Sequence, residues 1–153
     1  MNKIMAIDND DGIRLLYEEE LTYEGYKVIT ASGSDDIMGL IEQKRPNLVV
    51  LGVMLGSRNG LDLLMDIRNA YYDMPVILCT AYGEFRDDLR SIAADYYVIK
   101  SSDLSELKFR IKLAIESTAG LQKELPSGNP MEAAILTELM NSACHMPLQW
   151  PGT

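Results

Sequence analysis

The stretch LVVLGVMLG (48–56) decides the fold of this chain. It carries no charge, and its residues are aliphatic up to Gly52. A continuous apolar run of this length is typical of a strand that is buried on both faces, as in a parallel sheet covered by helices. Open sheets of this kind collect their functional groups at the carboxyl ends of the strands. The sequence therefore places Gly52, a residue without a side chain, where a functional group is expected.

Further apolar runs lie on both sides of this one, and each run is followed by a segment with the residue spacing of a helix. The predicted strands are 3–7, 26–30, 47–53, 75–81 and 95–100. The predicted helices are 13–25, 34–44, 60–71, 84–94 and 104–118, with Gly25 as a helix stop and Ser34 as an N-cap. This alternation predicts an α/β fold, a three-layer doubly wound (βα)5 sandwich around a central five-stranded parallel sheet.

Polar residues stand at the ends of several predicted strands. The segment DNDD (8–11) follows the first strand, Thr80 ends the fourth, and Lys100 follows the fifth. Because the carboxyl ends of parallel strands meet at one edge of a sheet, these residues are expected to lie close to Gly52. Asp and Asn are also favoured in turns and at helix N-caps, so an alternative interpretation of DNDD is a turn followed by a capped helix start.

The sequence changes character after residue 118, where the predicted domain 1–118 ends. Residues 119–130 are rich in Gly, Pro and Ser and are interpreted as a linker. Residues 131–145 have helical spacing, with Asn129 as N-cap, and predict one extra C-terminal helix that packs on the protein's own surface or on a second copy. The tail 146–153 is expected to fray.

Composition narrows the class of protein. The chain has 153 residues and a formal net charge of −9, and such an acidic surface disfavours binding to nucleic acid. No apolar segment is long enough to cross a bilayer, and acidic residues follow the amino terminus too soon for a signal peptide. Cys79 and Cys144 form no disulfide or zinc pattern. These features predict a cytoplasmic protein that binds neither nucleic acid nor membrane.

Residues 2–118 resemble the receiver domain of response regulators in two-component systems, the CheY-like domains of bacterial signalling. The resemblance rests on KIMAIDNDDGIRLLYEEELTYEGYKVITA (3–31), PNLVVLGVMLGSRNGLDLL (46–64), PVILCTAYGE (75–84) and ADYYVIKSSDLSELK (94–108). It implies the flavodoxin-like fold and a role in phosphorelay signal transduction rather than an enzymatic one. Its implied partner is a protein, such as a histidine kinase, a phosphotransfer protein or an effector, and a homodimer is a further possibility.

In that family an aspartate after the third strand accepts a phosphoryl group, and acids after the first strand hold Mg²⁺. A Thr or Ser after the fourth strand and a Lys after the fifth bind the phosphoryl oxygens, and an aromatic residue three positions before the Lys responds to phosphorylation. The resemblance assigns the first acid to Asp8, the hydroxyl to Thr80, the lysine to Lys100 and the switch aromatic to Tyr97. Tyr96 and Tyr97 alternate on a strand, so one is expected to face inward and the other outward.

Two positions depart from the family pattern. Asn9 stands in place of the second acid, and Gly52 stands in place of the phosphoacceptor aspartate. Asp8 is then the one retained ligand, so Mg²⁺ is expected to bind weakly at best, no residue is catalytic, and no cofactor is required. Lys100, without its usual carboxylate partner, is expected to pair with Asp8. The interval from Thr80 to Lys100 is also short for the family, which predicts a shortened fourth helix or loop.

The sequence thus predicts a degenerate receiver whose vestigial pocket comprises Asp8, Asn9, Gly52, Thr80 and Lys100, and which signals by protein contact without aspartyl phosphorylation. Two alternatives stay open. One is an active receiver that uses another acid among Asp8, Asp10 and Asp11. The other is a flavodoxin-like binder of a small molecule, which predicts an apolar pocket.

Overall fold

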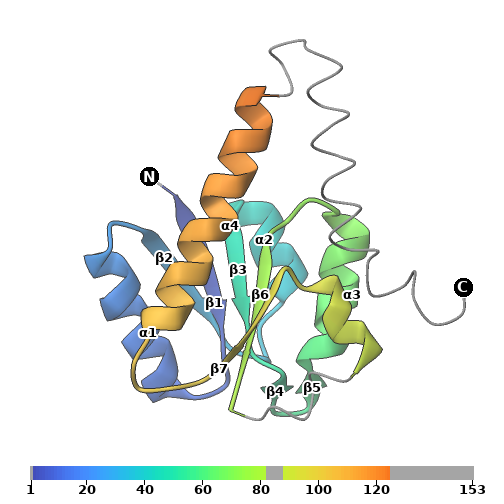
Figure 1. Cartoon of the computed structure of the whole chain (residues 1–153). Helices are drawn as coiled ribbons and strands as arrows, with labels where there is room; N and C mark the ends of the chain where they lie inside the picture. The colour runs from blue at the N-terminus through green and yellow to red at the C-terminus, as the bar shows by residue number, and fades with distance from the viewer. Residues whose placement is uncertain (1, 82–87, 125–153) are drawn as a thin grey trace, which may run out of the picture. The chain divides into compact units, whose positions relative to one another are not determined.

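The computed structural model describes residues 2–81 and 88–124. The main sheet is parallel, and its strands lie in the order β2-β1-β3-β6-β7 (Figure 1). These strands are β1 (Lys3–Ile7), β2 (Lys27–Ala31), β3 (Leu48–Leu51), β6 (Val76–Thr80) and β7 (Tyr96–Ile99). The predicted doubly wound α/β fold with a five-stranded parallel sheet is confirmed.

Four α-helices are described, and side chains cap the starts of α1, α2 and α3. They are α1 (Asp11–Tyr23), α2 (Ile37–Lys44), α3 (Gly60–Ala70) and α4 (Ser105–Glu124). Asp10 caps α1 by accepting from the N–H groups of Gly12 and Ile13, so part of DNDD does act as a helix start. The predicted N-cap of α2 is wrong: the helix begins at Ile37, and Asp36 rather than Ser34 accepts the Gly39 N–H.

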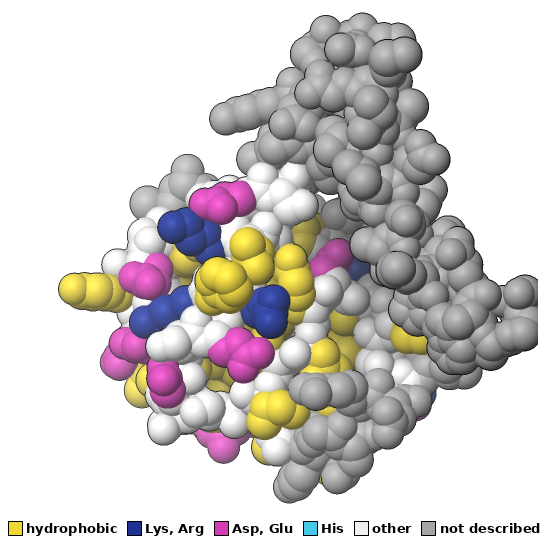
Figure 2. Space-filling view, viewed as in Figure 1, with side chains coloured by type: hydrophobic (Ala, Val, Ile, Leu, Met, Phe, Trp, Pro, Cys, Tyr) yellow, Lys and Arg dark blue, Asp and Glu magenta, His cyan; other side chains and the backbone are white. Residues whose placement is uncertain are grey.

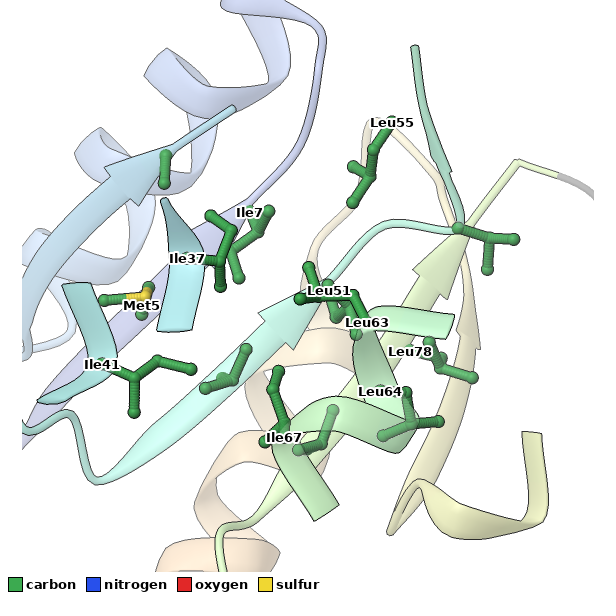
Figure 3. Packing of buried hydrophobic residues seen from close by; sticks show 14 of the residues in the cluster. Met5, Ile7, Ile37, Ile41, Leu51, Leu55, Leu63, Leu64, Ile67 and Leu78 are labelled. Atoms are coloured by element: carbon green, nitrogen blue, oxygen red, sulfur yellow. The ribbon is translucent and has the colours of Figure 1, made fainter. Parts of the chain in front are cut away.

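Successive residues of the central strands supply two apolar cores, one on each face of the sheet. Met5 and Ile7 of β1 pack in a core with α2 and α3, which Figure 3 shows from close by. Ile4 and Ala6 pack in the other core, with α1 and α4. All residues of β3 are 0% exposed, which explains its uninterrupted apolar sequence.

The segment between β6 and β7 departs most from the prediction. Its described part holds a 3₁₀ helix, η2 (Leu89–Ala93), where the sequence predicts an α-helix over 84–94. Asp88 caps η2 by accepting from the Arg90 N–H, and the Ser91 hydroxyl donates to the Asp88 carbonyl. The α-helix prediction is therefore wrong for Leu89–Ala93. The physical reason is that these local side-chain hydrogen bonds compete with the backbone hydrogen bonds of an α-helix. Residues 82–87 lie outside the described part.

Arg68 of α3 braces this segment. Its guanidinium donates to the Ala93 carbonyl at 2.6 and 3.0 Å, and to the Tyr72 and Met74 carbonyls at 2.8 and 2.6 Å. It also reaches the Asp95 carboxylate at 3.2 Å. One side chain therefore joins the end of α3, the loop before β6 and the turn before β7.

A small antiparallel hairpin, β4 (Met54–Leu55) and β5 (Arg58–Asn59), links β3 to α3. The apolar pattern does not predict it, because strands of two residues are too short to leave a periodic signal. Gly56 lies in the turn with φ 69°, a left-handed conformation that glycine adopts without strain. Asn59 then caps α3 by accepting the Leu61 N–H at 2.8 Å.

The chain divides into two compact units, Met1–Ile115 and Glu116–Thr153. Helix α4 continues to Glu124 rather than ending at 118, and it does so in spite of Gly120; Pro126 lies two residues beyond its last residue. The remainder of the predicted linker, the predicted helix 131–145 and the tail 146–153 lie outside the described residues. In the part of the chain that is described, no helix has the length and apolar character needed to span a membrane.

Candidate functional site

Strand register brings the predicted site residues to one edge of the sheet. Ile7 of β1 is paired with Leu51 of β3, and the Gly52 N–H donates to the Ile7 carbonyl at 2.9 Å. Asp8 and Gly52 are therefore neighbours at the ends of adjacent strands. On β6 and β7, the Lys100 N–H donates to the Thr80 carbonyl at 2.7 Å, which makes these two residues neighbours as well.

Asp8 is the buried charge of this site, with an exposed fraction of 2%. Its Oδ1 accepts the Asp10 N–H at 2.9 Å. Its Oδ2 forms an ion pair with the Nζ of Lys100, and among the described residues Oδ2 has no other hydrogen-bonding partner. The predicted pairing of Lys100 with Asp8 is thus confirmed. A buried carboxylate is costly unless it is paired, so the ion pair with Lys100 offsets part of the cost of burying Asp8.

Gly52 is enclosed by the site. A Cβ built on Gly52 would lie 3.3 Å from Asp8 Oδ2, from the Ile7 carbonyl oxygen and from the Leu55 side chain. The start of α3 presses on the same place, because a Cβ on Gly60 would lie 1.9 Å from the Gly52 carbonyl oxygen. The Gly60 N–H also donates to the Val53 carbonyl at 2.6 Å. Position 52 can hold a small side chain after slight adjustment, whereas position 60 requires glycine.

Asn9 lies at the exposed rim of the site. The Nδ2 of Asn9 is 3.0 Å from where a Cβ on Gly56 would stand, so its amide lies against the β4–β5 turn. Thr80, by contrast, is buried, with an exposed fraction of 2%. The site therefore combines one buried carboxylate, one buried hydroxyl, one ammonium group and one amide at the rim.

A second polar pair lies in the core that α1 and α4 cover. The hydroxyl of Tyr17 and the thiol of Cys79 share a hydrogen bond of 3.2 Å, and both residues are buried. Burial raises the pKa of both groups; for Cys79 the hydrogen bond with Tyr17 and the charge of Lys100 act in the opposite direction. Sequence reasoning missed this pair, since both residues sit in apolar patterns that indicate core.

The tyrosines of β7 alternate between the two cores. Tyr96 packs against the core of α1 and α4, and Tyr97 packs against the core of α2 and α3. Both are half-buried, so the expectation that one faces outward is wrong. The reason is that helices cover both faces of the sheet. Arg110 also stacks over the Tyr96 ring at 5.3 Å, a cation–π contact.

A cavity of about 280 Å³ lies beside Lys100. Its lining mixes apolar and polar side chains, among them Cys79, Val98, Leu104, Ser105 and Glu106. On the described part of the face shown in Figure 2, adjacent apolar side chains form a group, and side chains of both charges lie around it. The mixed lining of the cavity differs from the apolar pocket that the small-molecule alternative predicts.

Comparison with known proteins agrees with this geometry. The family described as response regulator receiver domain matches residues 4–112. Among curated proteins, the chain is 38% identical over 112 residues to the probable transcriptional regulator ycf27 of Porphyra purpurea, covering 72% of this chain and 46% of that protein. The corresponding protein of Cyanophora paradoxa is 33% identical over 118 residues, with 49% of its length covered. The chain thus spans about half the length of these relatives.

Among solved structures, the chain is similar to the response regulator protein TrrA of Thermotoga maritima in complex with Mg²⁺-BeF. The TM-score is 0.72 at 37% identity, covering 74% of this chain and 99% of that one. A second structure holds TrrA in complex with the histidine kinase ThkA, with a TM-score of 0.70 at 36% identity, covering 75% of this chain and 99% of that one.

Proposed function

Because the chain belongs to the response regulator receiver domain family, we propose that it acts in two-component signalling as a pseudo-receiver, a domain that contacts protein partners without aspartyl phosphorylation. The observation that carries this proposal is Gly52. It occupies the end of β3, next to Asp8 and enclosed by α3, and it offers no carboxylate to a phosphoryl donor.

The other acids near this edge already have structural roles. Asp8 is buried and paired with Lys100. Asp10 caps α1 through two backbone N–H groups, and Asp11 pairs with Arg14. These roles favour the pseudo-receiver over a receiver that uses a substitute acid, because phosphorylation of Asp8 or Asp10 would disrupt the buried ion pair or the cap of α1.

We propose a protein as the partner of this domain. The complex of TrrA with the histidine kinase ThkA supports this, since TrrA is similar over almost its whole length. Transcriptional regulation, which the ycf27 proteins are named for, belongs to chains about half of which is matched here. The net charge of −9 favours a protein partner over nucleic acid for this chain. Asp8, Asn9, Thr80 and Lys100 are then the remains of a phosphorylation pocket, and Tyr97 is a former switch residue.

The test is intact mass after incubation with acetyl phosphate and Mg²⁺. The wild type is compared with Gly52→Asp/Asn9→Asp, which restores both missing acids, and with Gly52→Asn/Asn9→Asp, a control of nearly the same shape without the acceptor carboxylate. We expect one phosphoryl group on the restored variant and none on the other two.

Phosphoryl uptake by the wild type would overturn the pseudo-receiver proposal, and peptide mapping would then identify the acceptor among Asp8, Asp10 and Asp11. Binding to a histidine kinase by the unphosphorylated wild type, measured by calorimetry, tests the protein-contact part separately.

A further inference from the structure

We infer that the ammonium group of Lys100 replaces the divalent cation of this site and keeps the site closed to such cations. The inference deepens the proposed function and rests on it, since it concerns the same edge of the sheet. The inference explains which interaction stabilises the carboxyl ends of the strands when neither Mg²⁺ nor a phosphoryl group is bound there.

The residues present do not fit Mg²⁺. This ion prefers a near-octahedral set of oxygen ligands and is usually held in proteins by carboxylates. At this edge the one buried carboxylate is Asp8, position 9 is an amide that lies against Gly56, and position 52 has no side chain. Within residues 2–81 and 88–124, no group of three or more His, Cys, Asp or Glu side chains is placed to hold a metal ion.

Lys100 already occupies the place of a cation. Its Nζ contacts Asp8 Oδ2, the oxygen that lies 3.3 Å from a Cβ built on Gly52. Asp8 thus turns its second oxygen toward the end of β3, where the absent side chain leaves room. The side chain of Lys100 is 23% exposed and that of Asp8 is 3% exposed, so the pair is largely shielded from water.

A divalent cation would have to displace this ammonium group. The ammonium is tethered to the end of β7 and is therefore present at a high effective concentration. Mg²⁺ would also have to shed bound water, which it does reluctantly, in exchange for a single carboxylate. The tethering of the ammonium group and the cost of dehydrating Mg²⁺ both favour the ion pair. The charge and shape of this edge of the sheet therefore do not depend on the Mg²⁺ concentration.

The experiment is a titration of the full chain with Mg²⁺ by calorimetry and with Mn²⁺ by electron paramagnetic resonance. The variant is Lys100→Met, and the matched control is Lys108→Met, which removes an equal charge from a pair with Glu20 on α4 and α1. We expect no saturable binding by the wild type or the control, and weak but saturable binding by Lys100→Met, in which the Asp8 carboxylate is unpaired. Adding Asp8→Asn to Lys100→Met should abolish the gain, and Lys100→Arg, which keeps the charge, should stay closed.

Wild-type binding as tight as that of Lys100→Met would overturn the inference, as would a Lys100→Met variant that gains nothing. Should Lys100→Met fail to fold, the Tm of the wild type with Mg²⁺ and with EDTA decides, because a Tm that rises with Mg²⁺ contradicts a closed site. Tight Mg²⁺ binding without phosphoryl uptake would overturn this inference alone, whereas phosphoryl uptake by the wild type would overturn the proposed function.

Discussion

The carboxylate of Asp8 and the ammonium group of Lys100 meet across the ends of two intervening strands. Asp8 follows β1 and Lys100 follows β7, while β3 and β6 lie between them. The contact requires the length of the lysine side chain, because two strands lie between the two residues. The ion pair links the end of β1 to the end of β7 across β3 and β6, at the edge of the sheet where the family has its phosphorylation site.

The ion pair is expected to contribute strongly to stability in a double-mutant cycle. Lys100→Met leaves a buried carboxylate unpaired and should lower the free energy of unfolding by about 3–5 kcal/mol. Asp8→Asn leaves only a partly exposed lysine and should cost less. The double variant should be more stable than Lys100→Met alone, as measured by urea unfolding, and a coupling energy near zero would contradict the role of the pair.

Gly60 is expected to tolerate no side chain, whereas its neighbour Gly52 tolerates a small one. Gly60→Ala would drive a Cβ into the carbonyl oxygen of Gly52, so it should shift backbone and cost about 3 kcal/mol or more. Gly52→Ala meets contacts at 3.3 Å and should cost about 1 kcal/mol or less. Thermal unfolding of the two variants measures the difference, and equal losses would show that the approach of α3 to β3 is looser than described.

Arg68 is expected to control the local stability of the segment from η2 to β7. Arg68→Lys removes the planar set of donors that reaches three carbonyl groups, and it should cost about 1–3 kcal/mol. It should also speed amide hydrogen exchange in residues 89–96. Arg90→Lys is the control, because Arg90 pairs with the Asp62 and Asp88 carboxylates near the surface and should cost less stability than Arg68→Lys. Equal exchange rates in the two variants would contradict a bracing role for Arg68.

The Cys79 thiol is expected to make stability fall in mildly alkaline solution. Burial raises the pKa of this thiol in the folded state, so above the unfolded value of about 8.5 the unfolded state releases its proton first. Its contribution to stability is therefore complete below about pH 8 and declines as the pH rises further.

The measurement is the urea midpoint between about pH 7 and pH 9.5 in a Cys144→Ser background, where Cys79 is the remaining thiol. Cys79→Ala in the same background should flatten the decline. A decline that persists unchanged in Cys79→Ala would assign it to other groups.

The sequence was sufficient for the main sheet, because five continuous apolar runs alternate with segments of helical spacing. It was insufficient where local hydrogen bonds decide the structure. Asp36 outcompetes Ser34 as the cap of α2, and Asp88 favours a 3₁₀ turn at η2. The pairing of Lys100 with Asp8 could be predicted from their opposite charges once the resemblance to receivers placed both residues in one pocket. The Tyr17–Cys79 bond depends on which strand and helix meet, which periodicity does not specify.

The close approach of Gly60 to Gly52 holds the backbone at position 52 in place, although no side chain is present there. The backbone there is held by β1 on one side, through the Ile7 carbonyl, and by the start of α3 on the other. The fixed backbone would therefore set the direction of the Cα–Cβ bond of any side chain that is introduced at position 52. Acidic, amide or thiol groups could be installed there one at a time and compared on a single background.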